Sequence, residues 1–576
     1  MTSFSFRSFL LFSFVLLMSG CATYGANVGS GLQQFEQGNL AGAAASFEQT
    51  LSPTGQDRLL YHLELGVIRH RQQQYEVSNQ LLTTAEKIAE NQETISVTDT
   101  LKTLMSNPRQ GTYGGSEFEK MFINYYKAMN YLGLAMQATT SAEFDNSLEG
   151  ARIESRRLIL RLNDLESRIG NYQEKNDKDR ETFNKLLKLF SRLKGQLIDF
   201  DNIRYRDDAL AHYLTGITFE MNGEYDDAII SYRKSAQAYE QGFTKQFRLD
   251  PAMTEQAWFD TIRMMRKDGG FNSEWRALAS KKLSKQRRQE LNQWDNTAQV
   301  IVVEHKGLMP QRQELNLEVA ANPTLQALQI RPYLYSNNRA QLAWFYLLYA
   351  DKSVIDAVAN YLDATEAAFI FNSFTKTESL GPLWSTVVDL GLDQAIGTSM
   401  RITVPYYEPV KPLGTSQLTL NGKTQPLLKA SNPALMAIQE QMLRSGTDIQ
   451  LALARSSLKA LTAASVANAG SNGNSGGFGG ILSTIGKLTA QLTEAAETRS
   501  WLLLPQDIRI RRVPLSAGQH TLSLQSTLLP GQISQNRQTF DLQNGDIKLW
   551  QVRSLPGMQA PIQETPVKRL LQTSNQ

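Results

Sequence analysis

The stretch that decides the fold of the amino-terminal half is GITFEMNGEYDDAIISYRKSAQAYEQG, residues 216–242. Apolar residues recur at helical spacing on both sides of the turn-forming sequence NGEY, which predicts two helices joined by a short turn. Gly216 is followed after nine residues by Tyr225, after twelve by Ala228 and after sixteen by Tyr232. A small residue opposite a bulky one lets two antiparallel helices approach closely, so the stretch predicts a helical hairpin.

The same spacing occurs twice more near the amino terminus. The two further sets are Gly31, Leu40, Ala43 and Phe47, and Gly66, Tyr75, Ser78 and Leu82. A weaker fourth set is Ala135, Phe144, Ser147 and Ala151. The spacing resembles the tetratricopeptide repeat, although the tryptophan usual near the start of that repeat is absent. Stacked hairpins of this kind predict an α-solenoid with a concave face, here within a helical domain of residues 21–297.

A long charged segment separates the second and third hairpins. Residues 145–200 carry leucine and isoleucine at helical spacing among many charged residues. This pattern predicts long amphipathic helices that form a helical arm.

The pattern changes near residue 298, and residues 298–576 are predicted to form a β-rich domain. Short β-branched and apolar runs alternate with turn sequences, of which Asn421–Gly422 and Asn544–Gly545 are typical of tight hairpins. About six to eight strands are expected, and a small antiparallel β-sandwich is the simplest arrangement for them. The whole chain is therefore predicted to be an α+β protein.

Helices and one glycine-rich loop are expected to interrupt these strands. The helices are predicted at residues 340–374, 433–467 and 481–498. The loop NAGSNGNSGGFGG, residues 468–480, lacks the GxxxxGK[ST] pattern of a phosphate-binding loop. We expect it to be a flexible connection.

The first twenty residues have the layout of a signal peptide. A single charge, Arg7, precedes the apolar run of residues 9–18, which is too short to be a stable membrane span. Two small residues then precede Cys21, the only cysteine of the chain. This arrangement resembles the lipobox of bacterial lipoproteins. The resemblance implies cleavage after residue 20, acylation of Cys21 and, because Ala22 is not aspartate, the periplasmic face of the outer membrane.

Composition and motifs argue against several other classes of protein. The 59 basic and 56 acidic residues nearly balance, so no electrostatic footprint for nucleic acid is present. No zinc-protease motif or serine-nucleophile elbow occurs, and no nucleotide, cofactor or metal ligand set is expected. The histidines are scattered and predicted to be structural: His62, His70, His212, His305 and His520. The most site-like cluster is Tyr406, Tyr407 and Glu408, with an aromatic strand end packed in the core as the alternative.

Three stretches carry a resemblance to a known family. They are VVEHKGLMPQRQE (302–314), ITVPYYEPV (402–410) and ETRSWLLLPQDIRIRRVPLSAGQHTLSL (497–524). These are similar to segments of proteobacterial outer-membrane lipoproteins with tetratricopeptide-like repeats and no assigned activity. Genes of that family often lie near those for lipoprotein activators of penicillin-binding proteins. The resemblance implies a fold and a location, supplies no catalytic residues, and leaves residues 340–400 unplaced.

The leading hypothesis is a scaffold or adaptor, anchored to the outer membrane, whose helical repeats bind an unidentified periplasmic or membrane protein. The first alternative is an accessory factor of peptidoglycan synthesis or envelope assembly, suggested by the gene neighbourhood of the similar family. The second alternative is a cell-wall hydrolase, which would need a pair of carboxylates in a cleft. We expect the protein not to be an enzyme.

Overall fold

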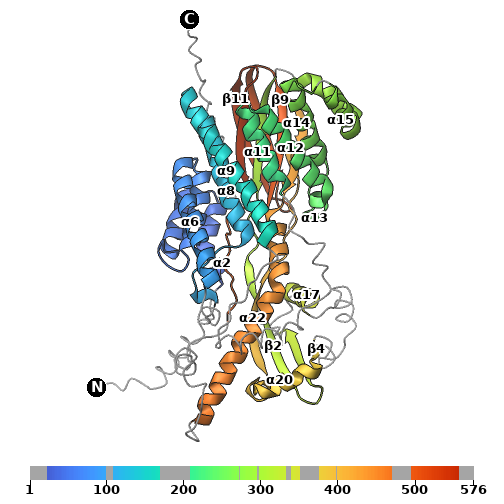
Figure 1. Cartoon of the computed structure of the whole chain (residues 1–576). Coiled ribbons are helices and arrows are strands. Elements are labelled where there is room, and N and C mark those ends of the chain that lie inside the picture. Colours follow the sequence, from blue (N-terminus) through green and yellow to red (C-terminus); the bar gives the residue numbers. More distant parts are fainter. Residues whose placement is uncertain are drawn as a thin grey trace, which may run out of the picture.

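The protein combines a helical amino-terminal half with a carboxy-terminal half of several sheets, as the α+β prediction requires (Figure 1). A computed structural model describes residues 23–98, 108–168, 208–271, 273–294, 297–332, 339–349, 375–396, 399–469 and 495–556. The predicted signal peptide, Cys21, all but two residues of the glycine-rich loop and much of the arm lie outside these residues.

Antiparallel helices follow one another through the amino-terminal half. Their bounds are α2 Tyr24–Asn27, α3 Gly29–Glu36, α4 Leu40–Thr50, α5 Arg58–Arg71, α6 Tyr75–Thr98, α8 Glu117–Gln137, α9 Ser141–Arg168, α11 Ala209–Met221, α12 Tyr225–Ala238, α13 Thr244–Gln246, α14 Ala252–Asp268, α15 Glu274–Lys282 and α16 Lys285–Glu290. Short 3-10 or π turns lie at Pro108–Gln110, Tyr239–Phe243 and Leu291–Trp294. From α3 to α14 these α-helices, apart from the three-residue α13, pack in chain order, each against the next.

The glycines of the repeated spacing lie where two helices touch. A Cβ atom built on Gly31 would come 2.8 Å from the ring of Phe47, and one on Gly66 would come 2.8 Å from Leu82. On Gly216 it would come 2.6 Å from the ring of Tyr232. The structure therefore brings together the first and last residues of each set. Any side chain larger than hydrogen would push the paired helices apart.

The turns of these three hairpins also share a backbone conformation. Gly38, Gln73 and Gly223 each lie two residues before the second helix, and each has a positive φ, of 78°, 60° and 76° respectively. Glycine adopts this conformation freely, whereas glutamine does so at a cost. Gln73 is therefore the unusual member of the three.

The strands form three four-stranded sheets, which we name sheets A, B and C. The strands are β1 Ala298–Lys306, β2 Arg312–Asn322, β3 Ala327–Pro332, β4 Lys376–Ser379, β5 Met400–Tyr407, β6 Ser416–Leu420, β7 Lys423–Pro426, β8 Leu428–Ser431, β9 Asp507–Leu515, β10 Gly518–Thr527, β11 Ile533–Leu542 and β12 Ile547–Ser554. Sheet A has the order β12-β1-β9-β8, sheet B the order β4-β3-β2-β5 and sheet C the order β11-β10-β6-β7.

Sheet A lies between the helices and sheet C, and β1 shows this most clearly. All nine of its residues are buried. Ile301 and Val303 belong to the core shared with the helices, whereas Val300 and Val302 belong to the core shared with sheet C. Successive side chains of a strand point to opposite faces, so both faces of sheet A are covered. The helical array and one face of sheet A thus share one core across residues 297 and 298.

Sheet B forms a separate unit with its own core. The long helix α22, Pro433–Ala469, packs against β5, and shorter helices complete the unit (Figure 1). These are α17 Arg339–Leu348, α20 Trp384–Asp389 and α21 Leu392–Ile396, with a 3-10 turn at Gly381–Leu383. Its buried residues, such as Leu317, Ile402 and Leu453, form a cluster distinct from the one around sheet A.

The sheets differ from the sequence-based expectation in three respects. A third sheet is present, and β1 and β12 pair in parallel. The turn at Asn421–Gly422 does join a paired hairpin, with φ values of 48° and 75°. The hairpin expected at Asn544–Gly545 is wrong, because β11 pairs with β10 in sheet C while β12 pairs with β1 in sheet A. Alternation identifies the buried face of a strand but does not identify its neighbour.

The helix predictions in this half have mixed outcomes. The helix predicted at residues 433–467 is confirmed as α22. The helix predicted at 481–498 is wrong at its described end, because residues 495–500 have no helical conformation. Most of the segment predicted at 340–374 lies outside the described residues, although α17 covers its start. Among the helices that the structure describes, none is long and apolar enough to cross a membrane.

Candidate functional site

The segment of residues 495–506 runs between the helices and sheet A, and carboxylates of the helices hold its backbone. Glu64 of α5 accepts hydrogen bonds from the backbone N–H groups of Leu502 and Leu503, at 2.9 and 3.0 Å. Glu119 of α8 accepts one from the N–H of Trp501 at 2.6 Å. A buried segment that lies outside the sheets must satisfy its N–H groups elsewhere, and these two side chains do so for residues 501–503.

Burial changes the charge of one of these carboxyl groups. Glu64 is completely buried, and burial raises its pKa to about 8. Burial therefore favours its protonated form far more than in an exposed glutamate.

An ion-pair network fastens the third hairpin to the centre of sheet A. Arg512 of β9 pairs with Glu220 of α11 at 2.6 Å and with Asp260 of α14 at 3.4 Å. Arg263 pairs with the same two carboxylates at 2.6 and 3.1 Å. Burial alone would raise the pKa of Glu220, but the two guanidinium groups hold it well below its usual value. The hydroxyl group of Tyr232 donates to Glu220 at 2.8 Å, so a residue of the repeated spacing belongs to this network.

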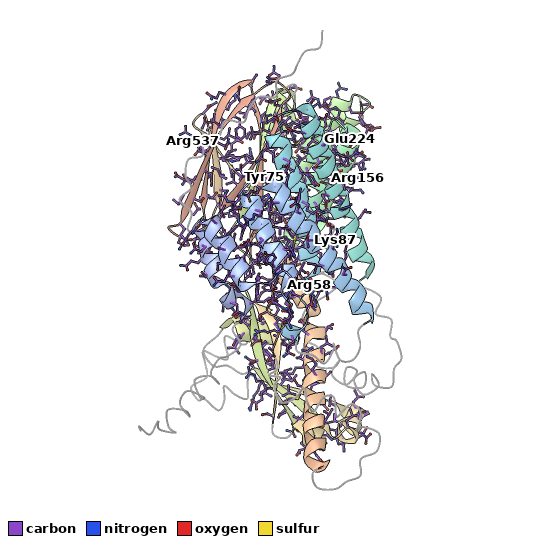
Figure 2. The ribbon with its side chains drawn as sticks, turned by 90° about the vertical axis from the view of Figure 1, so that its left-hand side faces the viewer. Arg58, Tyr75, Lys87, Arg156, Glu224 and Arg537 are labelled. Atoms are coloured by element: carbon purple, nitrogen blue, oxygen red, sulfur yellow. The ribbon has the colours of Figure 1, made fainter. Side chains whose placement is uncertain are left out.

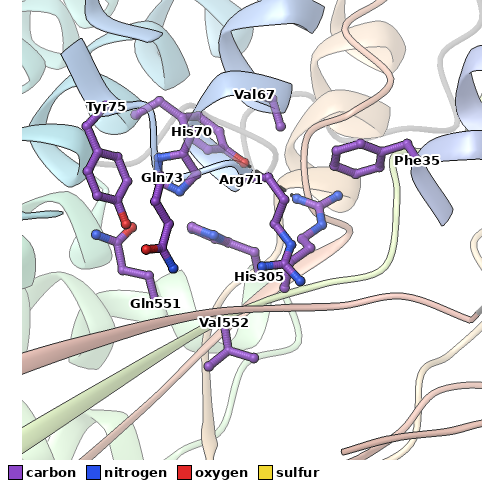
Figure 3. Close-up of a pocket in the computed structure, with 11 residues that line it drawn as sticks. Phe35, Val67, His70, Arg71, Gln73, Tyr75, His305, Gln551 and Val552 are labelled. Atoms are coloured by element: carbon purple, nitrogen blue, oxygen red, sulfur yellow. Dashed lines mark hydrogen bonds between the residues drawn. The ribbon is translucent and has the colours of Figure 1, made fainter. Parts of the chain in front are cut away.

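A polar cavity of about 30 Å³, partly open to solvent, lies where the second hairpin meets sheet A. Figure 3 shows residues that line it. Helices α5 and α6 contribute His70, Arg71 and Tyr75, and Gln73 comes from the turn between them. The remaining lining residues are Phe35, Val67, Tyr126, His305, Gln551, Val552 and Arg553, of which the last four belong to β1 and β12. Among the described residues, no aspartate or glutamate lines the cavity.

Arg553 is the most deeply buried cation of this cavity, at 4% exposed. Its guanidinium donates to the carbonyl groups of Gly307 and Leu503, at 2.8 and 2.9 Å. Within the described part of the chain it has no carboxylate partner, and its Nε atom is buried without a hydrogen bond. Burial lowers the pKa of Arg553, and burial together with the charge of Arg553 lowers the pKa of Arg71. Two guanidinium groups thus repel each other here.

The two histidines of the cavity are uncharged at neutral pH. Burial lowers the pKa of His70 to about 4. Burial, and then the proximity of His70, lower the pKa of His305 well below its usual value. The Nδ1 atom of His70 lies 2.7 Å from the side-chain oxygen of Asn130, and the Nε2 atom of His305 lies 2.7 Å from the hydroxyl of Tyr125. The positive charge of the cavity therefore comes from its arginines.

Most of the other residues that the sequence analysis named pack within the fold. Tyr406 and Tyr407 are both 3% exposed, in agreement with a strand end packed in the core, while Glu408 is exposed. His62 and His70 share α5, but only His70 reaches the cavity. Of the repeated spacing, Ala43, Phe47, Ser78, Leu82, Ala228 and Tyr232 are buried, whereas Leu40 and Tyr225 are half-buried.

Sequence reasoning missed the cavity. His70 and His305 lie far apart in the sequence, and their rings come within 5.9 Å only because β1 packs on α5 and α8. The one local signal was Gln73, at a turn position where the other two hairpins have glycine. In the described residues, no group of three or more histidine, cysteine or acidic side chains is placed to hold a metal ion.

Comparison with known proteins gives no assignment for this arrangement. No family model, no curated protein and no solved structure matches the chain. The function must therefore be argued from the residues themselves.

Proposed function

We propose that the protein is a lipid-anchored scaffold on the periplasmic face of the outer membrane, and that its helical array binds a protein partner. The observation that carries the proposal is the series of hairpins that repeat one glycine-to-bulky contact and one turn conformation. Repeated helical hairpins present extended surfaces that suit protein binding. We propose further that α3 to α14 form a tetratricopeptide-like solenoid and that sheets A and C form a sandwich.

The side of the array that faces sheet A is covered by the protein itself, so we assign partner binding to the opposite side. Figure 2 shows Lys87 of α6, Arg156 of α9 and Glu224, next to the start of α12, on one side of the molecule. Large apolar side chains are exposed on the same three helices: Val77, Ile153, Leu160 and Ile230, at 42%, 43%, 66% and 53%. Where exposed apolar side chains gather within a polar rim, they mark surfaces that bind other proteins.

The partner surface can be tested with a photo-crosslinking amino acid in cells. Placed at Leu160 on α9, it should capture a specific envelope protein. Placed at Ile533 of β11, which is exposed to a similar extent at 51%, it should not. Equal capture at the two positions, or none above background at Leu160, would contradict the proposal.

The anchor is tested separately by fractionation. Cys21→Ser should block processing and release the protein from membranes, because several acyl chains are needed for stable anchoring. Ala22→Asp should keep the lipid but move the protein to the inner membrane. A Cys21→Ser protein that still fractionates with the outer membrane would refute the lipid anchor.

A further inference from the structure

We propose that the cavity between the second hairpin and sheet A binds a carboxylate group held by Arg71 and Arg553. This inference concerns a small ligand and does not depend on the lipid anchor or on the protein partner. It depends on charge, space and backbone conformation at one place in the fold.

The charged residues around the cavity indicate that its ligand is negatively charged. Arg553 is buried, has no carboxylate partner among the described residues, and lines the cavity together with a second arginine. A buried cation without a counter-charge is costly, and an anionic ligand that pairs with it lowers that cost. Glu64 is close enough to attract Arg553, but burial raises the pKa of Glu64 to about 8, which weakens the negative charge that it offers. The two arginines that line the cavity therefore favour an anion there.

The volume of the cavity indicates which class of anion it binds. The cavity of about 30 Å³ accommodates roughly two water-sized atoms, since one such atom occupies about 10–15 Å³ on the same measure. A carboxylate, with three non-hydrogen atoms, is smaller than a phosphate or sulfate, with five, and suits a cavity of this size better. A carboxylate also accepts the strong, charge-assisted hydrogen bonds that guanidinium groups donate. Because the cavity is partly open to solvent, the rest of the ligand can remain outside.

Gln73 gives an independent indication of a binding role. It adopts φ of 60° at the turn where the equivalent residues, Gly38 and Gly223, are glycine. A non-glycine residue in this conformation stores strain of about 1 kcal/mol or more, and such strain gathers at binding sites. Its exposed side chain lines the cavity beside Gln551 (Figure 3). The amide is placed to donate to a group that enters the cavity.

The test measures binding by calorimetry and by thermal shift on the full-length mature protein at constant ionic strength. The probes are acetate, N-acetylglycine, N-acetylglycinamide and inorganic phosphate. We expect both carboxylates to bind and the amide to fail, because the amide has the same shape without the charge. N-acetylglycine binding more tightly than acetate would identify the end of a peptide chain as the source. Phosphate binding as tightly as the carboxylates, or binding of the amide, would overturn the assignment.

Two variants and one control separate binding from folding. Arg71→Gln should weaken carboxylate binding at least tenfold. Gln73→Gly should leave the melting temperature unchanged or higher, because glycine relieves the strained turn, yet should weaken binding several-fold. Arg69→Gln, on the same helix but paired with Glu48 at the surface, should change nothing. Unchanged affinity in both Arg71→Gln and Gln73→Gly would refute the site.

Discussion

Replacing Arg512 tests whether the helical array and sheet A are one cooperative unit. In the wild type Glu220 and Asp260 share two guanidinium groups, all of them 5% exposed or less. The variant Arg512→Met leaves both carboxylates to Arg263 alone, so one negative charge is buried without a partner. Breaking a buried pair in this way costs about 3–5 kcal/mol. The hydrogen bond from Arg512 to Gln299 at 2.6 Å is lost as well.

Urea unfolding, followed by circular dichroism and by tryptophan fluorescence, measures this cost. Arg331→Met provides the control, since Arg331 also lies on a strand and pairs with a glutamate, Glu318, but is 44% exposed. Exposed pairs contribute about 0–1 kcal/mol, so the control should shift the midpoint little. The reasoning would be refuted by an Arg512→Met shift no larger than that of the control.

A second substitution identifies charge as the cause. Asp260→Asn removes the surplus negative charge while keeping one acceptor oxygen. The double variant Arg512→Met/Asp260→Asn should therefore be less destabilised than the sum of its two single variants. Simple additivity would indicate that lost packing, and not the unpaired charge, explains the single variant.

Three further predictions concern individual contacts. Gly216→Ala should destabilise by about 1–3 kcal/mol through overpacking, whereas Gly29→Ala, with nothing within 4 Å, should not lower the melting temperature. His70 has its pKa lowered from 6.5 to about 4, so the stability it contributes is complete above pH 6.5 and is lost as pH falls. Melting temperatures between pH 7.5 and pH 5 should therefore fall less steeply in His70→Gln, and an identical slope would contradict the assignment. Glu119→Gln should lower the free energy of unfolding by about 1–3 kcal/mol, because the amide has one acceptor oxygen in place of two and leaves a buried N–H group without a partner. Hydrogen exchange at the backbone amide of Trp501 should become faster.

The helical hairpins could be predicted because their signal is local. The spacing from Gly216 to Tyr232 lies within two adjacent helices, and the structure places the two residues in contact. The turn at Asn421–Gly422 is equally local and correctly placed. In both cases the chain needs no distant segment to define the geometry.

The sheets and the cavity could not be predicted because they depend on distant partners. β9 and β10 follow each other with a short turn, as β11 and β12 do, yet each pair divides between sheets A and C. In an alternating strand, a charged residue such as Arg512 or Arg553 is expected to face solvent. Both side chains are instead buried. Only the fold reveals which charged residues meet each other.

The bonds from Glu64 to residues 502 and 503 have a consequence for the way the chain folds. They join groups 438 and 439 positions apart, and the parallel pairing of β1 with β12 also waits for the end of the chain. Contacts of such long range slow folding, and chains emerge amino terminus first. The apolar faces of the early hairpins that pack on sheet A must therefore stay exposed until the last strands have been synthesised. We expect refolding in the presence of a separately added fragment of residues 495–556 to rescue a truncated chain, as in fragment complementation.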